Sequence, residues 1–342
     1  MTHKEILLSG IARRAVPRVP AIILSSGVWT YCRNGLTLQD TFDLPPEKVA
    51  ECIIYNNEEI DADLIWVAAD CSNVALRAIG AKCTFDVLGG AATVDEPLVH
   101  SPSDIDRLKI EDLENSREIE NLLKSTRIVA DKIGDEYAIG ISQWGPFTLA
   151  GQLMGIENFM IATLRDKAGV KYVLEFTERL LLRYWNLFLD AGANLACQAE
   201  PTSSGDMISA KTFQELALPY IKSANDAISE KAEAKMLHIC GNTAKILDLI
   251  PQTGTDLFSL DHKVDLTLVR EKLDGKVAFA GQLDPVGVLL EGTPQTVEAA
   301  ARKCISDAGG NGYVLMPGCD IPPRTKIENV QAMIKTAHQA RM

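Results

Sequence analysis

The sequence lacks the features that define several large protein classes. None of its stretches approaches the roughly eighteen uninterrupted apolar residues that a membrane helix needs, and residues 1–10 lack the basic start and long apolar centre of a signal peptide. No Lys/Arg-rich run is present, and the net charge of −12 argues against a nucleic-acid partner. We therefore expect a cytoplasmic protein that binds neither membranes nor nucleic acids.

The sequence also lacks two glycine-rich nucleotide-binding patterns and any cluster of cysteines. Neither GxGxxG nor GxxxxGK[ST] occurs, which disfavours an open nucleotide-binding sheet. The eight cysteines are scattered through 342 residues, and a chain of this size does not need disulfides to fold. We expect free thiols, some of them buried and some of them chemically active.

Short apolar runs typical of buried strands alternate with longer amphipathic segments along the whole chain. This alternation predicts a parallel sheet with helical crossovers, and eight strands favour a closed barrel over an open sheet. We therefore predict an α/β protein, a single (β/α)8 TIM barrel domain over residues 1–342 with an N-terminal helical extension. The predicted strands are Ala21–Ser25, Leu64–Ala69, Ala138–Ser142, Ala193–Cys197, Lys235–Cys240, Asp256–Asp261, Val277–Gly281 and Tyr313–Met316.

Three helical regions are clear between these strands. Residues 156–189 are long enough for two helices, and residues 210–234 carry apolar residues at helical spacing. Thr293-Pro294 predicts a helix start, because threonine caps helices and proline suits the first helical position.

Polar residues gather where the predicted strands end. In barrel enzymes the active site is built at these carboxyl ends, from several strands at once. Strand-to-helix loops are polar in any case, so a single residue of this kind carries little weight, but the set together predicts a substrate pocket. Its predicted members are Asp70, Gln143, Trp144 and Gln282, with the carboxylates Glu200 and Asp261 beside them.

The most specific pattern is the pair His238 and Cys240. Side chains two residues apart on a strand leave the same face, so an imidazole and a thiol lie together there. Nitrogen and sulfur ligands suit tetrahedral zinc, and Cys319, after the last predicted strand, is the natural third ligand. Three protein ligands leave one position open, as in catalytic zinc sites. Glu200 or Asp261 could fill that position or orient His238 from behind.

At these residues the chain resembles the uroporphyrinogen decarboxylase superfamily, and within it the corrinoid-dependent methyltransferases that include the methylcobalamin:coenzyme M enzymes. The resemblance covers most of the chain and is strongest in the C-terminal half. It is carried by three stretches: His238-Ile239-Cys240-Gly241-Asn242; Gly281-Gln282-Leu283-Asp284-Pro285 with Gly292-Thr293-Pro294; and Pro317-Gly318-Cys319-Asp320-Ile321-Pro322-Pro323 with Glu328-Asn329.

The resemblance implies a function. In the methyltransferases an HxC pair and a later cysteine bind Zn²⁺, which carries over to His238, Cys240 and Cys319. The enzyme would move a methyl group between a corrinoid and a small substrate, most simply a thiol such as coenzyme M. The zinc-activated substrate is then the nucleophile, with no separate side-chain nucleophile. Members with their own cobalamin carry DxHxxG, which is absent here, so the corrinoid (cobalamin) would be supplied by a corrinoid protein.

Other interpretations stay open. Related barrels run the demethylation half-reaction, from an O-, N- or S-methyl donor onto the corrinoid. The decarboxylases bind a tetrapyrrole through an arginine-rich N-terminal motif, whereas residues 20–36 here hold a single arginine, Arg33. A non-catalytic metal- or tetrapyrrole-binding protein would need a closed site, and a zinc hydrolase would favour histidine and carboxylate ligands over two sulfurs.

Overall fold

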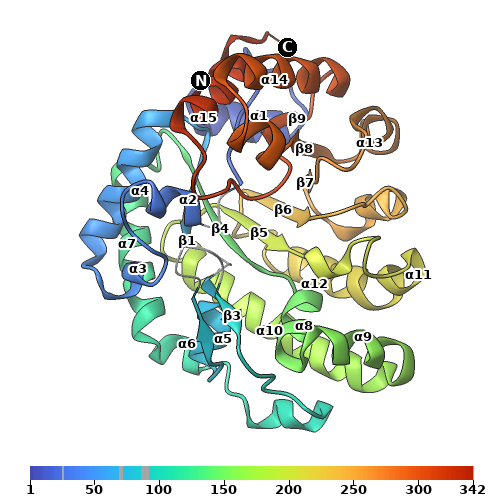
Figure 1. Ribbon diagram of the computed structural model, residues 1–342. Coiled ribbons are helices and arrows are strands. Elements are labelled where there is room, and N and C mark those ends of the chain that lie inside the picture. Colours follow the sequence, from blue (N-terminus) through green and yellow to red (C-terminus); the bar gives the residue numbers. More distant parts are fainter. Residues whose placement is uncertain (25–26, 69–71, 86–91, 342) are drawn as a thin grey trace.

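Seven parallel strands form the central sheet of the protein (Figure 1). The computed structural model describes residues 1–24, 27–68, 72–85 and 92–341. Each strand pairs in parallel with the next one along the chain. The strands are β1 (Leu64–Ala68), β4 (Ala138–Trp144), β5 (Leu195–Ala199), β6 (Ala234–Ile239), β7 (Leu257–Leu260), β8 (Ala278–Leu283) and β9 (Tyr313–Pro317).

Residues 20–22 close this sheet into a barrel. On one side Ala21 pairs in parallel with Leu315 of β9, and the Ile22 N–H donates to the Leu315 carbonyl at 3.0 Å. On the other side the N–H of Asp63, one residue before β1, donates to the Ala21 carbonyl at 2.9 Å. These residues therefore occupy the position of the eighth strand, and the predicted (β/α)8 barrel is confirmed.

The first predicted strand, over residues 21–25, is shorter than expected. Among the described residues it makes only an isolated bridge at Ala21. Pro20 has no N–H to donate to a ladder, and the Ile23 carbonyl accepts the indole N–H of Trp66 at 2.7 Å instead of a backbone donor. Residue 25 lies outside the described residues. The other seven predicted strands are present; residue 69, the predicted end of one of them, lies outside the described residues, and the remaining ends differ by at most two residues.

Helices surround the strands on the outside of the barrel (Figure 1). Each crossover buries its apolar stripe against the sheet, as parallel sheets require. Among the described residues, no helix has the length and apolar content needed to cross a bilayer. The principal helices are α4 (Pro46–Ile60), α5 (Val74–Ala78), α7 (Arg117–Ile133), α8 (Pro146–Met154), α9 (Ile156–Arg165), α10 (Lys167–Leu189), α12 (Leu218–Ala227), α13 (Leu266–Leu273), α14 (Pro294–Ala308) and α15 (Ile327–Gln339).

Shorter elements fill the connections. A two-stranded antiparallel pair, β2 (Cys83–Thr84) with β3 (Thr93–Val94), stands apart from the main sheet. The short elements are α2 (Val28–Cys32), α3 (Asp40–Asp43), β2 (Cys83–Thr84), β3 (Thr93–Val94), η2 (Pro102–Arg107), α6 (Asp112–Asn115), η3 (Pro201–Ser203), α11 (Ala210–Thr212), η4 (Phe213–Ala217), η5 (Leu247–Thr253) and η6 (Pro285–Leu290).

Two helix predictions are confirmed by local capping. Residues 156–189 form α9 and α10, which separate at Asp166, whose carboxylate accepts the Gly169 N–H at 3.0 Å. Thr293 caps α14, and its hydroxyl accepts the Thr296 N–H at 3.4 Å. The prediction for residues 210–234 extends too far, because the last helix there ends at Ala227 and Ala234 already belongs to β6.

The predicted N-terminal helical extension is α1 (His3–Ile11). It packs against β1, β4, β8 and β9, and its Lys4 N–H donates to the Glu136 carbonyl just before β4. The helix therefore lies at the amino ends of the strands, away from the ends where barrel enzymes place their active sites. The two chain ends lie close together (Figure 1), and the ring centroids of His3 and His338 are 5.7 Å apart.

A buried carboxylate joins these two ends to the barrel. Asp63 is fully buried, accepts the Ala21 N–H at 2.7 Å, and pairs with Arg18 at 2.6 Å and His3 at 2.8 Å. Burial opposes ionisation of Asp63, but hydrogen bonds from Arg18 and His3 outweigh it and hold the pKa of this carboxyl well below its usual range. Because the guanidinium already neutralises the carboxylate, this cluster is an ion network rather than a vacant cation site.

Candidate metal centre

Three predicted ligands come together at the carboxyl ends of β6 and β9. His238 lies on β6, Cys240 follows its last residue, and Cys319 follows β9 by two residues. Nε2 of His238 is 2.9 Å from Sγ of Cys240, and that sulfur is 3.2 Å from Sγ of Cys319. All three donor atoms lie within 4.8 Å of one another. Cys240 and Cys319 are 79 residues apart in sequence, and only barrel closure brings them into contact.

A serine on the next strand fixes the orientation of the imidazole. Ser259 of β7 is the register partner of His238, and its hydroxyl lies 2.7 Å from Nδ1 of the ring. Both side chains are buried. With Nδ1 engaged by the hydroxyl, Nε2 is directed to the two sulfurs. A partner on the second ring nitrogen is the usual arrangement behind a metal-binding histidine.

The two thiols differ in their acidity. Hydrogen bonding from Cys240, supported by His238, holds the pKa of the Cys319 thiol well below its usual range despite burial. Contact with Cys319 and burial raise the pKa of the Cys240 thiol. A cation bound at the centre would favour the thiolate form of both sulfurs.

This donor set fits a zinc ion. Zinc bonds of about 2.0–2.3 Å put the ligands of one tetrahedral ion roughly 3–4 Å apart. The observed contacts of 2.9 Å and 3.2 Å lie close to that range. One nitrogen and two sulfurs are ligands that zinc prefers over magnesium or calcium. Among the described residues, no carboxylate joins this group of three.

The three donors line one side of a small cavity. Its volume is about 150 Å³, and it lies within the carboxyl-end rim of the barrel. Most of its lining is apolar, and Ser142 and Asp320 add polar groups to those of the three donors. The other lining residues are Leu24, Trp66, Ser142, Trp144, Ala199, Pro201 and Asp320.

Glu200 is placed as a helix cap. Its carboxylate is fully buried and accepts the N–H groups of Phe147 and Thr148 at 2.9 Å and 2.8 Å, at the start of α8, and the Thr148 hydroxyl at 2.7 Å. A carboxylate at a helix N-terminus is favourable. Burial raises the pKa of Glu200 to about 7, and these three hydrogen bonds oppose that rise. Its side chain ties the loops after β4 and β5 together.

Asp261 acts on the loop that carries Cys240. One carboxylate oxygen accepts the Gly241 N–H at 2.8 Å, and the other accepts the Lys263 N–H at 3.1 Å and lies 2.9 Å from Nδ1 of His262. Asp261 therefore holds the backbone next to a ligand. Neither Asp261 nor Glu200 contacts the His238 ring in the hydrogen bonds of the described residues; Ser259 does.

Of the predicted pocket residues that the structure describes, only Trp144 lines the cavity. Trp144 lines the cavity and donates its indole N–H to Oδ1 of Asn73 at 2.7 Å. Gln143 is buried but is not a lining residue, because strand alternation turns it away from the side to which Ser142 and Trp144 point. Gln282 donates its side-chain N–H to the Val264 carbonyl and also stays outside the cavity. Asp70 lies outside the described residues.

Several residues at the site carry no sequence signal that we used. Ser259 has no motif around it, and only its strand register beside His238 reveals its contact. Trp66 lies inside a strand that looks like ordinary core, yet it forms part of the cavity wall. Asp320 follows Cys319 after the last strand and lines the cavity itself. Asn329, in a stretch that carries the family resemblance, has a structural contact instead and donates to the Leu289 carbonyl at 2.8 Å.

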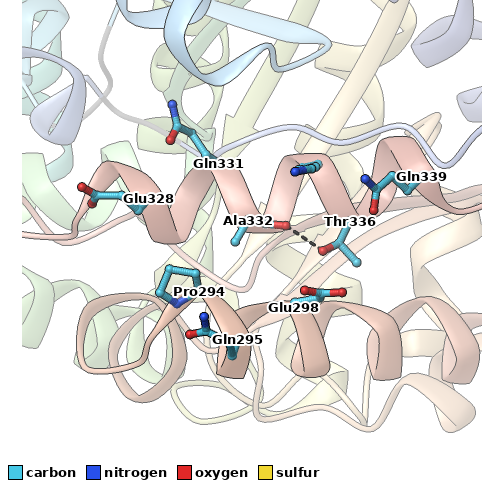
Figure 2. Close-up of a pocket in the computed structure, with 9 residues that line it drawn as sticks. Pro294, Gln295, Glu298, Glu328, Gln331, Ala332, Thr336 and Gln339 are labelled. Carbon is cyan, nitrogen blue, oxygen red and sulfur yellow. Dashed lines mark hydrogen bonds between the residues drawn. The ribbon is translucent and has the colours of Figure 1, made fainter.

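A wider groove lies on the outer surface of the barrel, between α14 and α15 (Figure 2). Its volume is about 390 Å³, larger than that of the cavity at the metal centre. None of its lining residues is histidine or cysteine, so it offers no comparable set of nucleophiles or metal ligands. The lining residues are Pro294, Gln295, Glu298, Glu328, Gln331, Ala332, Lys335, Thr336 and Gln339.

Comparisons with known proteins show which proteins this chain is similar to. The chain is 30% identical to the methylcobamide:CoM methyltransferase MtbA of Methanosarcina mazei, over 99% of this chain and 98% of that protein. It is 24% identical to a uroporphyrinogen decarboxylase of Chlorobium phaeobacteroides, over 98% and 97% of the two chains. A solved methyltransferase from Methanosarcina mazei shares the fold, with a TM-score of 0.85, 24% identity and 98% coverage of both chains. The model of the uroporphyrinogen decarboxylase (URO-D) family matches residues 2–340, and the chain belongs to this family.

Proposed function

We propose that this protein is a zinc-dependent methyltransferase that transfers a methyl group from a corrinoid to a small thiol. The acceptor named for the relatives MtbA and MtaA is CoM (coenzyme M). A further relative is named as a methylated-thiol–coenzyme M methyltransferase. The names of these methyltransferase relatives thus all describe methyl transfer to a thiol.

The observation that carries the proposal is the convergence of His238, Cys240 and Cys319 within 4.8 Å in a mostly apolar cavity. These residues would hold the zinc ion, and three protein ligands would leave one position for substrate. When bound, zinc would deprotonate a thiol that coordinates it, which supplies a nucleophile at neutral pH. A free thiol, with a pKa of about 8.5, is mostly protonated there.

The residues of the chain have three further roles in this proposal. Ser259 fixes the His238 ring so that Nε2 faces the sulfurs. Trp66 and Trp144 wall the cavity and exclude water from the reacting thiol. In the transfer itself the thiolate would form a bond to the methyl carbon of the methylated corrinoid while the cobalt–carbon bond breaks, and both electrons of that bond would stay with cobalt.

We further propose that the corrinoid arrives on a separate corrinoid protein. The chain lacks the DxHxxG motif of proteins that carry their own cobalamin. The cavity, at about 150 Å³, is smaller than the roughly 300 Å³ of pockets that enclose drug-sized ligands. A corrinoid would therefore present its methyl group at the carboxyl-end rim, while the small thiol occupies the cavity.

Porphyrinogen decarboxylation is the weaker candidate for this site. The small cavity argues against a tetrapyrrole substrate. Arg33 is the single arginine of residues 20–36, and it is engaged by Asn56 at 2.7 Å and by Glu59. It is therefore not available to bind the carboxylates of such a substrate.

The proposal is tested with purified, zinc-loaded protein, methylcob(III)alamin and a panel of small thiols under anaerobic conditions. We expect the visible spectrum of methylcobalamin to be lost in the presence of a thiol, and Cys240→Ala to abolish the change. If no thiol reacts, cob(I)alamin and methyl donors test the demethylation half-reaction. Silence in both directions, also with a corrinoid protein supplied, would overturn the proposal of methyl transfer.

A further inference from the structure

Asn73 does not use its side chain for the role that its position suggests. It is the residue before α5, where an asparagine side chain ordinarily accepts an N–H of its own helix. In the described chain it makes no such capping bond. Its amide instead reaches two other segments, the residue before β3 and the last residue of β4.

Both ends of this amide are engaged. Oδ1 of Asn73 accepts the indole N–H of Trp144 at 2.7 Å, and Nδ2 donates to the carbonyl of Ala92 at 2.6 Å. The indole nitrogen can only donate, which fixes the orientation of the amide. Asn73 is buried, with 3% of its surface exposed, so water competes little for either bond.

The backbone at this position also suits asparagine. The φ of Asn73 is +50°, in the left-handed region where asparagine is several-fold enriched among residues other than glycine. Asparagine therefore meets two requirements here, a left-handed backbone and an amide that holds a donor and an acceptor. Glycine would meet the first requirement and not the second.

The contact holds one wall of the cavity beside the metal centre. Trp144 lines that cavity together with the three metal-centre donors. It is only partly buried, whereas Trp29, Trp66 and Trp185 are at most 8% exposed. A tryptophan ring covers roughly 150–250 Å². Rotation of this ring would therefore change much of the wall of a cavity of about 150 Å³.

The second tryptophan of the wall is held in a different way. The indole N–H of Trp66 donates to the Ile23 carbonyl at 2.7 Å, and its ring lies against Gly140 of β4, where a Cβ would come within 2.8 Å of the ring. Backbone atoms therefore set the position of Trp66. The hydrogen bond that orients the Trp144 indole comes instead from a single side chain, which a substitution can remove.

We propose that Asn73 is a positioning residue for substrate binding: it fixes the Trp144 indole as the wall against which the carbon chain of the thiol packs. This role rests on the thiol methylation proposed above. Asn73 neither lines the cavity nor belongs to the three metal-centre donors. Its loss should therefore weaken binding of the thiol and leave the zinc content unchanged.

A double-mutant cycle tests whether Asn73 acts through Trp144. Asn73→Gly removes the amide and tolerates the left-handed backbone, and Trp144→Phe keeps a ring but removes the N–H. Zinc-loaded protein is titrated by calorimetry with coenzyme M and with 2-mercaptoethanol. We expect Asn73→Gly alone to weaken binding about fivefold, the factor typical of one hydrogen bond, and to have no further effect when combined with Trp144→Phe. In turnover with methylcobalamin, KM should rise while kcat changes less than about twofold.

Tryptophan fluorescence reports the ring itself. Acrylamide should quench Trp144 most, because the other three tryptophans are buried. Quenching should increase in Asn73→Gly, and Trp144→Phe should abolish this increase. Asn121→Ala is the control, since Asn121 of α7 also donates to two carbonyls, those of Thr41 and Leu44, and does not line the cavity. It should keep both the thiol affinity and the quenching of the unmodified protein.

The outcomes separate this role from the proposed function. Equal weakening by Asn73→Gly with and without Trp144→Phe, or no weakening at all, would overturn the positioning role and leave methyl transfer standing. Absence of thiol binding to the unmodified zinc-loaded protein would count against thiol methylation itself and would overturn both.

A measurement on the unmodified protein decides the question if Asn73→Gly does not fold. In protein labelled with ¹⁵N-tryptophan, the indole N–H signal of Trp144 is identified by its loss in Trp144→Phe. This signal should exchange slowly with solvent and should shift when coenzyme M or 2-mercaptoethanol is added. Rapid exchange, or no shift with a thiol that binds, would overturn the positioning role.

Discussion

The Ser259 hydroxyl lies 2.7 Å from Nδ1 of His238, while the other ring nitrogen lies 2.9 Å from the Cys240 sulfur. The two residues are register partners on β7 and β6, so the contact is set by strand pairing. It decides which nitrogen faces the metal centre, because a ring nitrogen engaged by a hydroxyl is not free to coordinate an ion. The orientation of the imidazole is therefore fixed by the barrel before any ion binds.

Removal of this hydroxyl should weaken metal binding. We expect Ser259→Ala to lower zinc affinity by roughly 10–100-fold, as for other partners of metal-binding histidines. Competition with a chromophoric chelator measures the affinity. Ser125→Ala is the matched control, since Ser125 is also buried but donates to the Leu122 carbonyl within α7. Equal affinities in Ser259→Ala and Ser125→Ala would contradict the orienting role.

Loss of a cysteine of the centre should lower zinc affinity, whereas loss of a buried cysteine elsewhere should not. We expect Cys319→Ala to lose more than about 100-fold in zinc affinity, a larger loss than that from an orienting residue. Cys197→Ala, at a fully buried position on β5, should keep the metal. Metal analysis after dialysis gives the zinc content, and the thiolate-to-cobalt absorption of cobalt-substituted protein reports the sulfur ligands. Retained sulfur-to-cobalt absorption of full intensity in Cys319→Ala would exclude Cys319 as a ligand.

Glu200 should act on stability and leave the metal content unchanged. Glu200→Gln replaces one acceptor oxygen by an amide that cannot accept from Phe147 or Thr148. A buried donor left without an acceptor costs about 1–3 kcal/mol, so the melting temperature should fall. Glu175→Gln, on the exposed side of α10, should melt as the unmodified protein does. Loss of zinc from folded Glu200→Gln would instead favour the alternative that Glu200 is a metal ligand.

The network around Asp63 predicts a pH dependence of stability. The hydrogen bond to Asp63 raises the pKa of His3, against the effect of burial. The protonated ring therefore stabilises the fold fully below its unfolded pKa of about 6.5, and this contribution is lost as pH rises through the raised folded value. The melting temperature should fall more between pH 6 and pH 8 in the unmodified protein than in His3→Gln.

The control for this pH dependence is His100→Gln, at an exposed position before η2. It should keep the full decrease in melting temperature between the two pH values. A decrease of the same size in His3→Gln and in the unmodified protein would show that His3 does not contribute to it.

Much of the fold was predictable because it depends on local pattern. Apolar runs bounded by polar residues located seven of the strands to within one or two residues. The Thr293-Pro294 start of α14 followed from capping chemistry, and the length of residues 156–189 indicated the two helices α9 and α10. The weakest prediction was the first strand, because Pro20 and the indole of Trp66 remove ladder hydrogen bonds in a way that a single apolar run does not reveal. The single-domain organisation over residues 1–342 stays a prediction.

The sequence by itself determined the types of chemistry at the site: one imidazole and one thiol on a shared strand face, and a second thiol after the last strand. These depend only on residue identity and on the alternation of side chains along a strand. Tertiary structure alone decided that Cys319 reaches Cys240, that Ser259 orients His238, and that Glu200 caps α8. Each of these contacts joins residues on different strands or loops, whose distance is set by the register and closure of the barrel. No local spacing in the chain encodes that register, which is why the ligands could be named from the sequence and their supporting contacts could not.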